Sequence, residues 1–146
     1  MSLRRFINQK EPFIQMDDSH TVESAINRMI ETKKGAVIIV DDGTTVRGVF
    51  TERDVMTKIV AEGRDPAQTV LKDVMTTDVV MLPATSTLDH AIRVMGKNGI
   101  RHLPIEDGNH HIIGVISLRH LLHEKVGMVV EELNAVEAYE NDSLGG

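Results

Sequence analysis

The sequence has no cysteine and no tryptophan, and aromatic residues make up only 3% of its 146 residues. Without cysteine, a disulfide, a thiolate zinc site and a cysteine nucleophile are all excluded. So few aromatic side chains argue against a surface that stacks nucleic-acid bases. A formal net charge of −6 argues against a surface that follows phosphates. We therefore expect no nucleic-acid partner.

Long hydrophobic runs are also missing. No apolar stretch approaches the roughly 20 residues that a membrane-spanning helix needs, and the first residues lack the apolar segment of a secretory signal. We expect no membrane partner. The absence of cysteine fits a reducing cytoplasm, which is the predicted location, while Arg4 and Arg5 in an N-terminal stretch without early acids leave an organellar matrix open.

The sequence does contain a long internal repeat. After a shift of 66 residues, residues 21–56 align with residues 87–122 without a gap, and nine of the 36 pairs are identical. The identical residues of the first copy are Thr21, Ala25, Ile26, Met29, Ile39, Asp41, Gly48, Val49 and Arg53. Chance rarely preserves such a pattern over this length. The chain length by itself predicts one compact unit with one continuous core.

Both copies show the same order of elements. Apolar residues at helical spacing after Thr21, a plausible N-cap, predict a helix. A β-branched run at 36–40 predicts a buried strand, and a second strand follows a turn at 46–50. Next comes a helix over 52–62, with Gly63 as its stop and with four residues expected to face inward: Val55, Met56, Ile59 and Val60. The second copy repeats this order at 88–98, 102–105, 112–116 and from 118; extended segments at 12–16 and 79–82 precede the first helices.

These elements predict an α/β (α+β) fold, in which two βαββα repeats pack about a pseudo-two-fold axis and leave clefts at their junction. The predicted organisation is an N-terminal arm (1–11), a first repeat (12–66), a linker with a short helical turn (67–78), a second repeat (79–126), a C-terminal helix (127–140) and a disordered tail (141–146).

A motif with binding chemistry closes the first copy: Gly48-Val49-Phe50-Thr51-Glu52-Arg53-Asp54. The carboxylate of Asp54 can accept two hydrogen bonds from the cis-diol of a ribose. Thr51 lies at a strand-to-helix junction, where backbone N–H groups favour phosphate, and Arg53 can add positive charge. The same spacing also fits a capping box, in which the hydroxyl and the carboxylate satisfy backbone N–H groups. The two roles are compatible if Thr51 caps the helix while Asp54 reaches outward.

The paired repeats, together with the segments GVFTERDVM and GIRHLPIED and the run TERDVMTKIVAEGRDP, resemble the CBS-domain pair, or Bateman module, over residues 12–125. The resemblance is to the stand-alone tandem type in particular. It implies two clefts that bind adenine nucleotides, and the family's ribose-binding acid falls on Asp54. It also implies that the second copy completes this principal site. There Val79 and Val80 face the adenine, and the phosphate side is lined by Gly99, Arg101, His102 and Pro104.

Plainer roles exist for some of these residues. Helix termination explains Gly99 and strand rigidity explains Pro104, while an ordinary surface charge is only an alternative for Arg101.

The symmetry-related motif departs from the family pattern. Ser117 and Arg119 keep the hydroxyl and the charge, but His120 stands where the acid is expected. An imidazole accepts at most one hydrogen bond, so it cannot hold a diol with two. The facing wall of this second site consists of Ile14, Lys34 and Ala36. We expect this site to be weak, altered or empty.

Seven histidines raise the question of a metal, above all His110 with His111 and His120 with His123. Zinc requires three or four ligands at defined spacing, which these pairs do not supply. We expect no metal. No set of serine and histidine residues resembles a catalytic triad, and we expect no enzymatic activity.

Beyond the second copy, apolar residues alternate at spacings of four and three: Leu122, Val126, Val129, Leu133 and Val136. This is a coiled-coil-like seam of about two heptads, too short to stand alone. It needs a surface on its own domain or on a second subunit, and the N-terminal arm raises the same question. The resemblance implies homodimers, which favours dimer contacts for both segments.

The leading interpretation is a regulatory sensor that binds AMP, or failing that ATP, ADP or NAD(H), and transmits a conformational change to a partner protein. The sequence does not identify that partner. Two alternatives stay open: an interaction or dimerisation module that binds no nucleotide, and a small metal-dependent enzyme.

Overall fold

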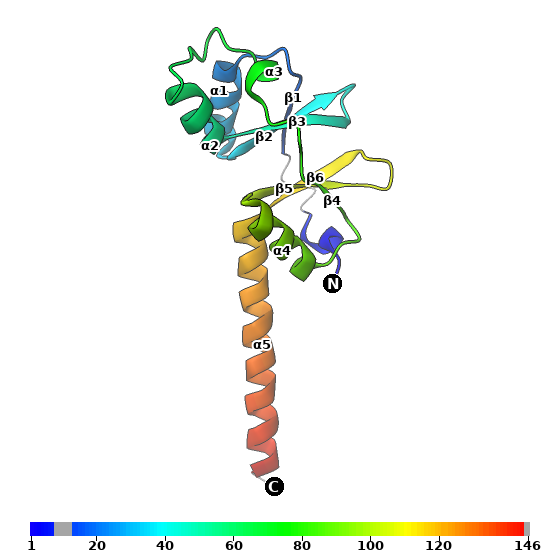
Figure 1. Cartoon of the computed structure of the whole chain (residues 1–146). Helices are drawn as coiled ribbons and strands as arrows, with labels where there is room; N and C mark the ends of the chain where they lie inside the picture. Colours follow the sequence, from blue (N-terminus) through cyan, green and yellow to red (C-terminus); the bar gives the residue numbers. More distant parts are fainter. Residues whose placement is uncertain (8–12, 145–146) are drawn as a thin grey trace.

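The computed structural model describes residues 1–7 and 13–144, with side chains as far as Asn141. Two lobes, one for each repeat, lie one above the other, and a long helix extends away from the second lobe (Figure 1). The arrangement confirms the predicted pair of βαββα repeats.

The two repeats contain equivalent three-stranded sheets. In each, the first strand is parallel to the middle strand and the third is antiparallel to it. The middle strands carry a bulge at equivalent positions, Ile39/Val40 and Ile105/Glu106. Repeat 1 consists of β1 (Ile14–Met16), α1 (Val22–Thr32), β2 (Ala36–Asp41), β3 (Thr45–Thr51), α2 (Glu52–Asp54) and the π-helix η2 (Val55–Val60). Repeat 2 consists of β4 (Leu82–Pro83), α4 (Leu88–Asn98), β5 (His102–Glu106), β6 (Ile112–Ser117) and α5 (Leu118–Leu144).

The first helix of each repeat begins and ends in the same way. The hydroxyl of Thr21 accepts a hydrogen bond from the backbone N–H of Ser24, and Thr87 caps α4 likewise. Each helix ends at a residue in the left-handed region, Lys33 (φ 56°) and Gly99 (φ 64°). Glycine adopts this conformation without strain, whereas lysine does not.

The helix predicted over 52–62 has a different geometry from the one expected. After α2 it widens into η2, in which the N–H of Ala61 bonds to Met56 and that of Arg64 to Ile59. These i→i+5 bonds change the angular position of each side chain relative to an α-helix. Ile59 is buried, as expected, but Met56 and Val60 are 64% and 71% exposed instead of facing inward.

The extended segment predicted at 79–82 is shorter than expected. Only Leu82 and Pro83 form β4, paired with Ile105 and Glu106. Val79 and Val80 lie outside the sheet, beside the junction of the two repeats.

Two short helices exchange places between the repeats. The helix α3 (Leu71–Val74) precedes repeat 2 but packs on repeat 1, where the N–H of Leu71 donates to His20 O at 2.9 Å. The 3-10 helix η1 (Leu3–Phe6) precedes repeat 1 but packs on repeat 2, where the N–H of Leu3 donates to Ser86 O at 2.8 Å. Since His20 and Ser86 are equivalent in the repeat, η1 and α3 are equivalent as well. The arm and the linker are therefore matching parts of the duplicated unit.

The buried apolar residues form two clusters, one in each repeat, and not the single continuous core that chain length suggested. Leu71 and Val74 of α3 belong to the first cluster, and Leu3 and Phe6 of η1 to the second. Leu3 is fully buried. The first residues of the arm therefore contact their own chain, where dimer contacts had been expected; the part of the arm at 8–12 lies outside the described residues.

The predicted C-terminal helix is the continuation of the last helix of repeat 2. Helix α5 runs unbroken for 27 residues, about 40 Å at 1.5 Å per residue. The tail expected to be disordered is helical over 141–144, while 145–146 lie outside the described residues.

Candidate functional site

Backbone pairing fixes the linker against the end of β3. The N–H of Val49 donates to Thr76 O and the N–H of Thr76 donates to Val49 O, both at 2.9 Å. Gly48 makes this approach possible, because a Cβ at that position would lie 2.7 Å from the sulfur of Met75. The linker residues after Thr76 are thus held beside the motif that closes repeat 1.

Thr51 and Asp54 form the capping box that the spacing of this motif also predicts. The hydroxyl of Thr51 accepts from the N–H of Asp54 at 3.3 Å, and Asp54 Oδ2 accepts from the N–H of Thr51 at 2.9 Å. The ammonium group of Lys58 lies 3.5 Å from Asp54 Oδ1. Asp54 therefore turns back to the helix start and does not simply reach outward.

The carboxylate of Asp54 retains binding capacity in this position. A carboxylate offers about four acceptor sites, and the capping box and Lys58 occupy two of them. The side chain is 14% exposed. Lys58 is itself anchored to the linker, through Val74 O at 2.8 Å and Thr76 Oγ1 at 3.1 Å. Asp54 is thus an anion of fixed orientation with lone pairs to spare.

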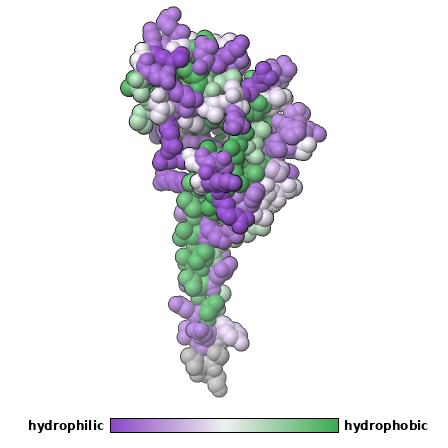
Figure 2. All heavy atoms as spheres, viewed as in Figure 1, coloured by the Kyte–Doolittle hydropathy of each residue, from purple (hydrophilic) through white to green (hydrophobic). Residues whose placement is uncertain are grey.

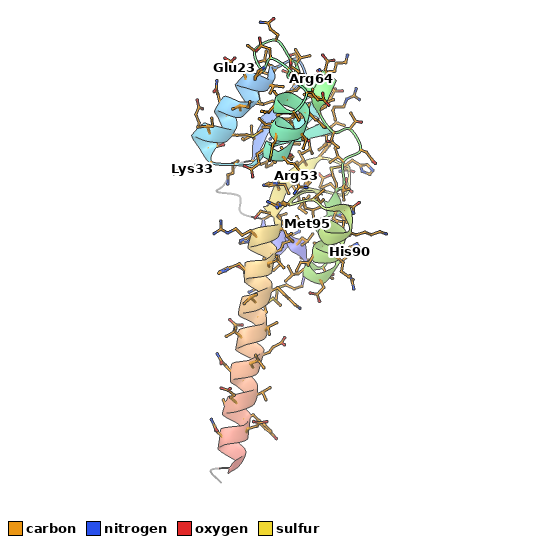
Figure 3. The ribbon with its side chains drawn as sticks, turned by 60° about the vertical axis from the view of Figure 1, so that its left-hand side comes forward. Glu23, Lys33, Arg53, Arg64, His90 and Met95 are labelled. Atoms are coloured by element: carbon orange, nitrogen blue, oxygen red, sulfur yellow. The ribbon has the colours of Figure 1, made fainter. Side chains whose placement is uncertain are left out.

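The facing wall comes from the start of β5. Figure 3 shows Arg53 at the level where the two repeats meet, and its guanidinium lies 3.5 Å from the carbonyl of Gly99. The carbonyl of Arg101 accepts from the N–H of Leu118 at 2.8 Å, which ties β5 to the start of α5. The repeat 1 equivalent is the 3.0 Å bond from Glu52 to the carbonyl of Gly35.

His102 is the perturbed titratable group of this wall. Burial lowers the pKa of His102 below its ordinary value of 6.5; the Glu52 carboxylate opposes that shift and the Arg101 charge adds to it. At pH 7 the imidazole is accordingly neutral, and it can both donate and accept a hydrogen bond.

These residues surround a cavity of about 220 Å³ at the junction of the repeats. All nine residues predicted for the principal site line it: Thr51, Arg53, Asp54, Val79, Val80, Gly99, Arg101, His102 and Pro104. Five further lining residues were not predicted: Val49, Glu52, Thr76, Asp78 and Ile100. Val49, Glu52 and Ile100 lie inside the quoted motifs and could have been included. Thr76 and Asp78 carry no sequence signal, since the Val49–Thr76 pairing alone places them there.

The second cleft is larger, about 1310 Å³, and the six residues predicted for it line it: Ile14, Lys34, Ala36, Ser117, Arg119 and His120. Ser117 Oγ accepts from the N–H of His120 at 3.1 Å, which reproduces the hydroxyl half of the capping box. The other half is absent because His120 has no carboxylate to reach back with. Phe6 contacts the His120 ring edge to face, at 6.3 Å between ring centroids.

The two cavities share one wall. Glu52, Arg101 and His102 line both of them. Gly35 lies between these side chains, since a Cβ on it would come within 3.1 Å of both the Glu52 carboxylate and the His102 ring. A displacement of these side chains in one cavity therefore also changes the lining of the other cavity.

Neither a metal site nor a membrane-spanning helix is found among the described residues. Within residues 1–7 and 13–144 no three histidine or carboxylate side chains are grouped as a metal site would require. In the same ranges no helix combines the length and the apolar character needed to cross a membrane.

Comparison with known proteins identifies the repeat. The family model of the CBS domain matches twice, over residues 7–61 and 71–127. A solved structure of a protein with CBS domains from Burkholderia ambifaria superposes with a TM-score of 0.80 at 27% identity, covering 87% of this chain and 95% of that one. The CBS domain pair of protein MJ0100, in complex with 5′-methylthioadenosine and S-adenosyl-L-methionine, gives a TM-score of 0.75 at 19% identity, covering 84% and 98%. At that identity the likeness concerns the fold.

Among curated sequences, a protein of Methanopyrus kandleri is 31% identical over 109 residues, which are 73% of this chain and 56% of that protein. The chain spans between 21% and 59% of the length of the first such relatives.

Proposed function

Because the chain belongs to the CBS domain family, with one copy in each half, we propose that it is a regulatory module that binds an adenosine nucleotide between its repeats. The observation that carries the proposal is the carboxylate of Asp54. It has a fixed orientation and spare lone pairs, and it lines a cavity whose opposite wall holds Arg101 and His102.

Each wall has a role in this proposal. Asp54 accepts hydrogen bonds from the two ribose hydroxyls. Val79 and Val80 supply apolar surface and backbone groups for the adenine. Arg53 and Arg101 supply positive charge for phosphate. The neighbour with bound 5′-methylthioadenosine and S-adenosyl-L-methionine supports an adenosine-type ligand for this fold.

The size of the cavity bears on which nucleotide binds. Ligand pockets usually enclose about 300–1,000 Å³, so a cavity of about 220 Å³ encloses only part of a nucleotide. We expect the nucleoside inside and the phosphate at the mouth. This favours AMP, followed by ADP and ATP and then NAD(H), whose second nucleoside needs a surface of its own.

The second cleft has the space but not the acid. At about 1310 Å³ it accepts a larger molecule, yet His120 cannot hold a ribose diol with two hydrogen bonds. We expect one nucleotide per chain. Binding in the first cleft shifts the population of repeat arrangements, and the shared wall of Glu52, Arg101 and His102 transmits the change.

Titration calorimetry with AMP, ATP and NADH tests the proposal on the wild type and on Asp54→Ala. A hydrogen bond to a charged group contributes about 1.5–3 kcal/mol, so the substitution weakens AMP binding by about 10- to 150-fold. Asp54→Asn is the matched control for the capping box, since its amide oxygen still accepts from the N–H of Thr51. Unchanged binding in Asp54→Ala would remove the site assignment.

The variant His120→Asp tests the second cleft in the opposite direction. The Ser117 half of the capping box is already formed there, so the new carboxylate completes the motif. A second equivalent of bound AMP is the expected result. Stoichiometry that stays at one would show that the acid is not what the second cleft lacks.

We further propose that the module is a homodimer that acts on a partner protein. Exposed apolar side chains support this. On two helices of repeat 1 they are Ile30, Met56 and Val60, and others lie along α5. The same surfaces support the alternative function, an interaction module that binds no nucleotide. That alternative predicts no thermal shift with any adenine compound and a partner recovered through α5.

A further inference from the structure

The unpartnered face of α5 is the feature that the nucleotide site does not use. Only the start of the helix packs on repeat 2, through Leu118, Leu121 and Met128 and an ion pair of 3.0 Å from Lys125 to Asp89. Every residue from Val129 to Asn141 is exposed. Figure 2 shows apolar surface continuing along this helix beyond the lobes. Its exposed members are Leu122, Val126, Val129, Val130, Leu133 and Val136.

We infer that a second copy of this chain covers that face and that the two α5 helices pair antiparallel. The inference rests on the proposed homodimer and specifies its geometry. The predicted seam, with its spacings of four and three, is the pattern by which two helices interlock. It is centred on Val129, so antiparallel pairing places Val126 opposite Leu133 of the second copy, and Leu122 opposite Val136.

Charge decides the direction of pairing. The first part of α5 carries Arg119, His120, His123 and Lys125 beside a single acid, Glu124, whereas no lysine or arginine follows Lys125. All charged residues of the later part are acids: Glu131, Glu132, Glu137, Glu140 and Asp142. Parallel helices would bring the two acidic halves together, with Glu137 beside Glu132 of the second copy. Antiparallel helices bring Glu137 toward Arg119 and His123, which lie on the same side of the helix as the seam.

A groove is present where the acidic end of the second copy would arrive. At the base of α5 a depression of about 570 Å³ is lined by Ser117, Arg119, His120, Leu122, His123 and Val126. Ser117, Arg119 and His120 also line the second cleft. The acidic helix end of one copy therefore reaches the mouth of the other copy's second cleft, where it adds the negative charge that His120 lacks.

The absence of cysteine makes the direction of pairing measurable. Val126→Cys and Leu133→Cys are prepared separately with different tags, mixed and oxidised. Antiparallel pairing gives a disulfide only between the two different variants. Like positions then lie about seven residues apart along the axis, roughly 10 Å, which exceeds the Cα separation of about 4.4–6.8 Å that a disulfide allows.

A charge reversal supplies the second readout. In Glu137→Lys a lysine faces Arg119 and His123, and two symmetric attractions become repulsions, so sedimentation analysis shows dimer dissociation about tenfold stronger. Glu131→Lys is the matched control, because Glu131 lies on the opposite side of α5 from the seam. It leaves dissociation unchanged.

Each outcome has one meaning. Cross-linking of each variant with itself indicates parallel pairing and overturns the inference. A dimer that neither cross-links nor responds to Glu137→Lys also overturns it and leaves the homodimer proposal intact. A wild-type monomer overturns both. AMP titration on the same proteins reports separately on the nucleotide site, since Val126, Leu133, Glu137 and Glu131 lie outside its lining.

Discussion

Two equivalent glycines should respond differently to the same substitution. Gly48 and Gly114 both face a residue of the exchanged helical segments. A Cβ on Gly48 would meet the Met75 side chain at 2.7 and 2.9 Å and the backbone oxygen of Thr76 at 3.0 Å. A Cβ on Gly114 would come within 2.8 Å of a single methyl group of Ile7, with its other neighbours at 3.5 Å or beyond.

The difference lies in what has to move. Thr76 is held by two backbone bonds to Val49 and cannot give way alone, whereas the methyl group of Ile7 requires only a small side-chain displacement. Overpacking costs about 1–3 kcal/mol. We expect Gly48→Ala near the upper end and Gly114→Ala near the lower end. At about 2–4 °C per kcal/mol for a chain of this size, Tm falls by roughly 6–12 °C and 2–4 °C respectively.

AMP binding should also differ between Gly48→Ala and Gly114→Ala. Thr76 lines the principal cavity, and three further lining residues, Asp78, Val79 and Val80, follow within four positions. Gly48→Ala should therefore weaken AMP binding, while Gly114→Ala leaves it unchanged. Thermal denaturation and calorimetry measure both effects, with Gly96→Ala as control, since a Cβ there has no neighbour within 4 Å and alanine suits a helix. Equal Tm and equal AMP affinity for Gly48→Ala and Gly114→Ala would refute this reasoning.

Three further predictions concern single side chains. Leu3→Ala should lower the free energy of unfolding by about 2–5 kcal/mol in chemical denaturation, because Leu3 is fully buried in repeat 2; a loss below about 0.5 kcal/mol, as for a surface residue, would contradict the packing of η1. Lys33→Gly should stabilise the chain by about 0.5–1 kcal/mol, since Lys33 has φ 56° and glycine takes this conformation without strain; a lower Tm would contradict this. Because burial lowers the pKa of His102 in the folded chain, the unfolded chain binds the proton first, and stability falls as pH drops below about 6.5. Between pH 7.5 and 5.5, the Tm of ligand-free protein should fall less in His102→Asn than in the wild type. Equal falls in Tm would show that His102 does not contribute to the pH dependence.

Much of the fold and of the cavity lining could be predicted because local signals agree with each other. Thr21 and Thr87 mark helix starts, and the β-branched run of β2 marks a strand. The gap-free shift of 66 residues places the second copy. The lining residues of the principal cavity then follow from the resemblance, since its motifs lie at the end of one repeat and the start of the next.

Other features depend on contacts that no local pattern encodes. The exchanged segments escaped detection because Leu3 and Leu71 are related by a shift of 68 residues, two more than the repeat itself. The π-helix η2 has the apolar spacing of an ordinary helix, so its side chains were assigned to the wrong faces. The capping box of Thr51 and Asp54 follows from the local spacing, but the contact of Lys58 with Asp54 does not, because Lys58 is held by the linker carbonyl of Val74, 16 residues away.

The exchange of η1 and α3 also constrains the order in which the chain can fold. During synthesis η1 emerges before repeat 2, so its place on repeat 2 does not exist until that repeat has been made. Repeat 1, by contrast, can close as soon as α3 appears. Cutting the chain between the repeats would leave Leu3 and Phe6 on the half that contains repeat 1, although both pack in the core of repeat 2. The smallest independent unit is therefore the whole pair, and two separated halves should regain their structure only by coming together.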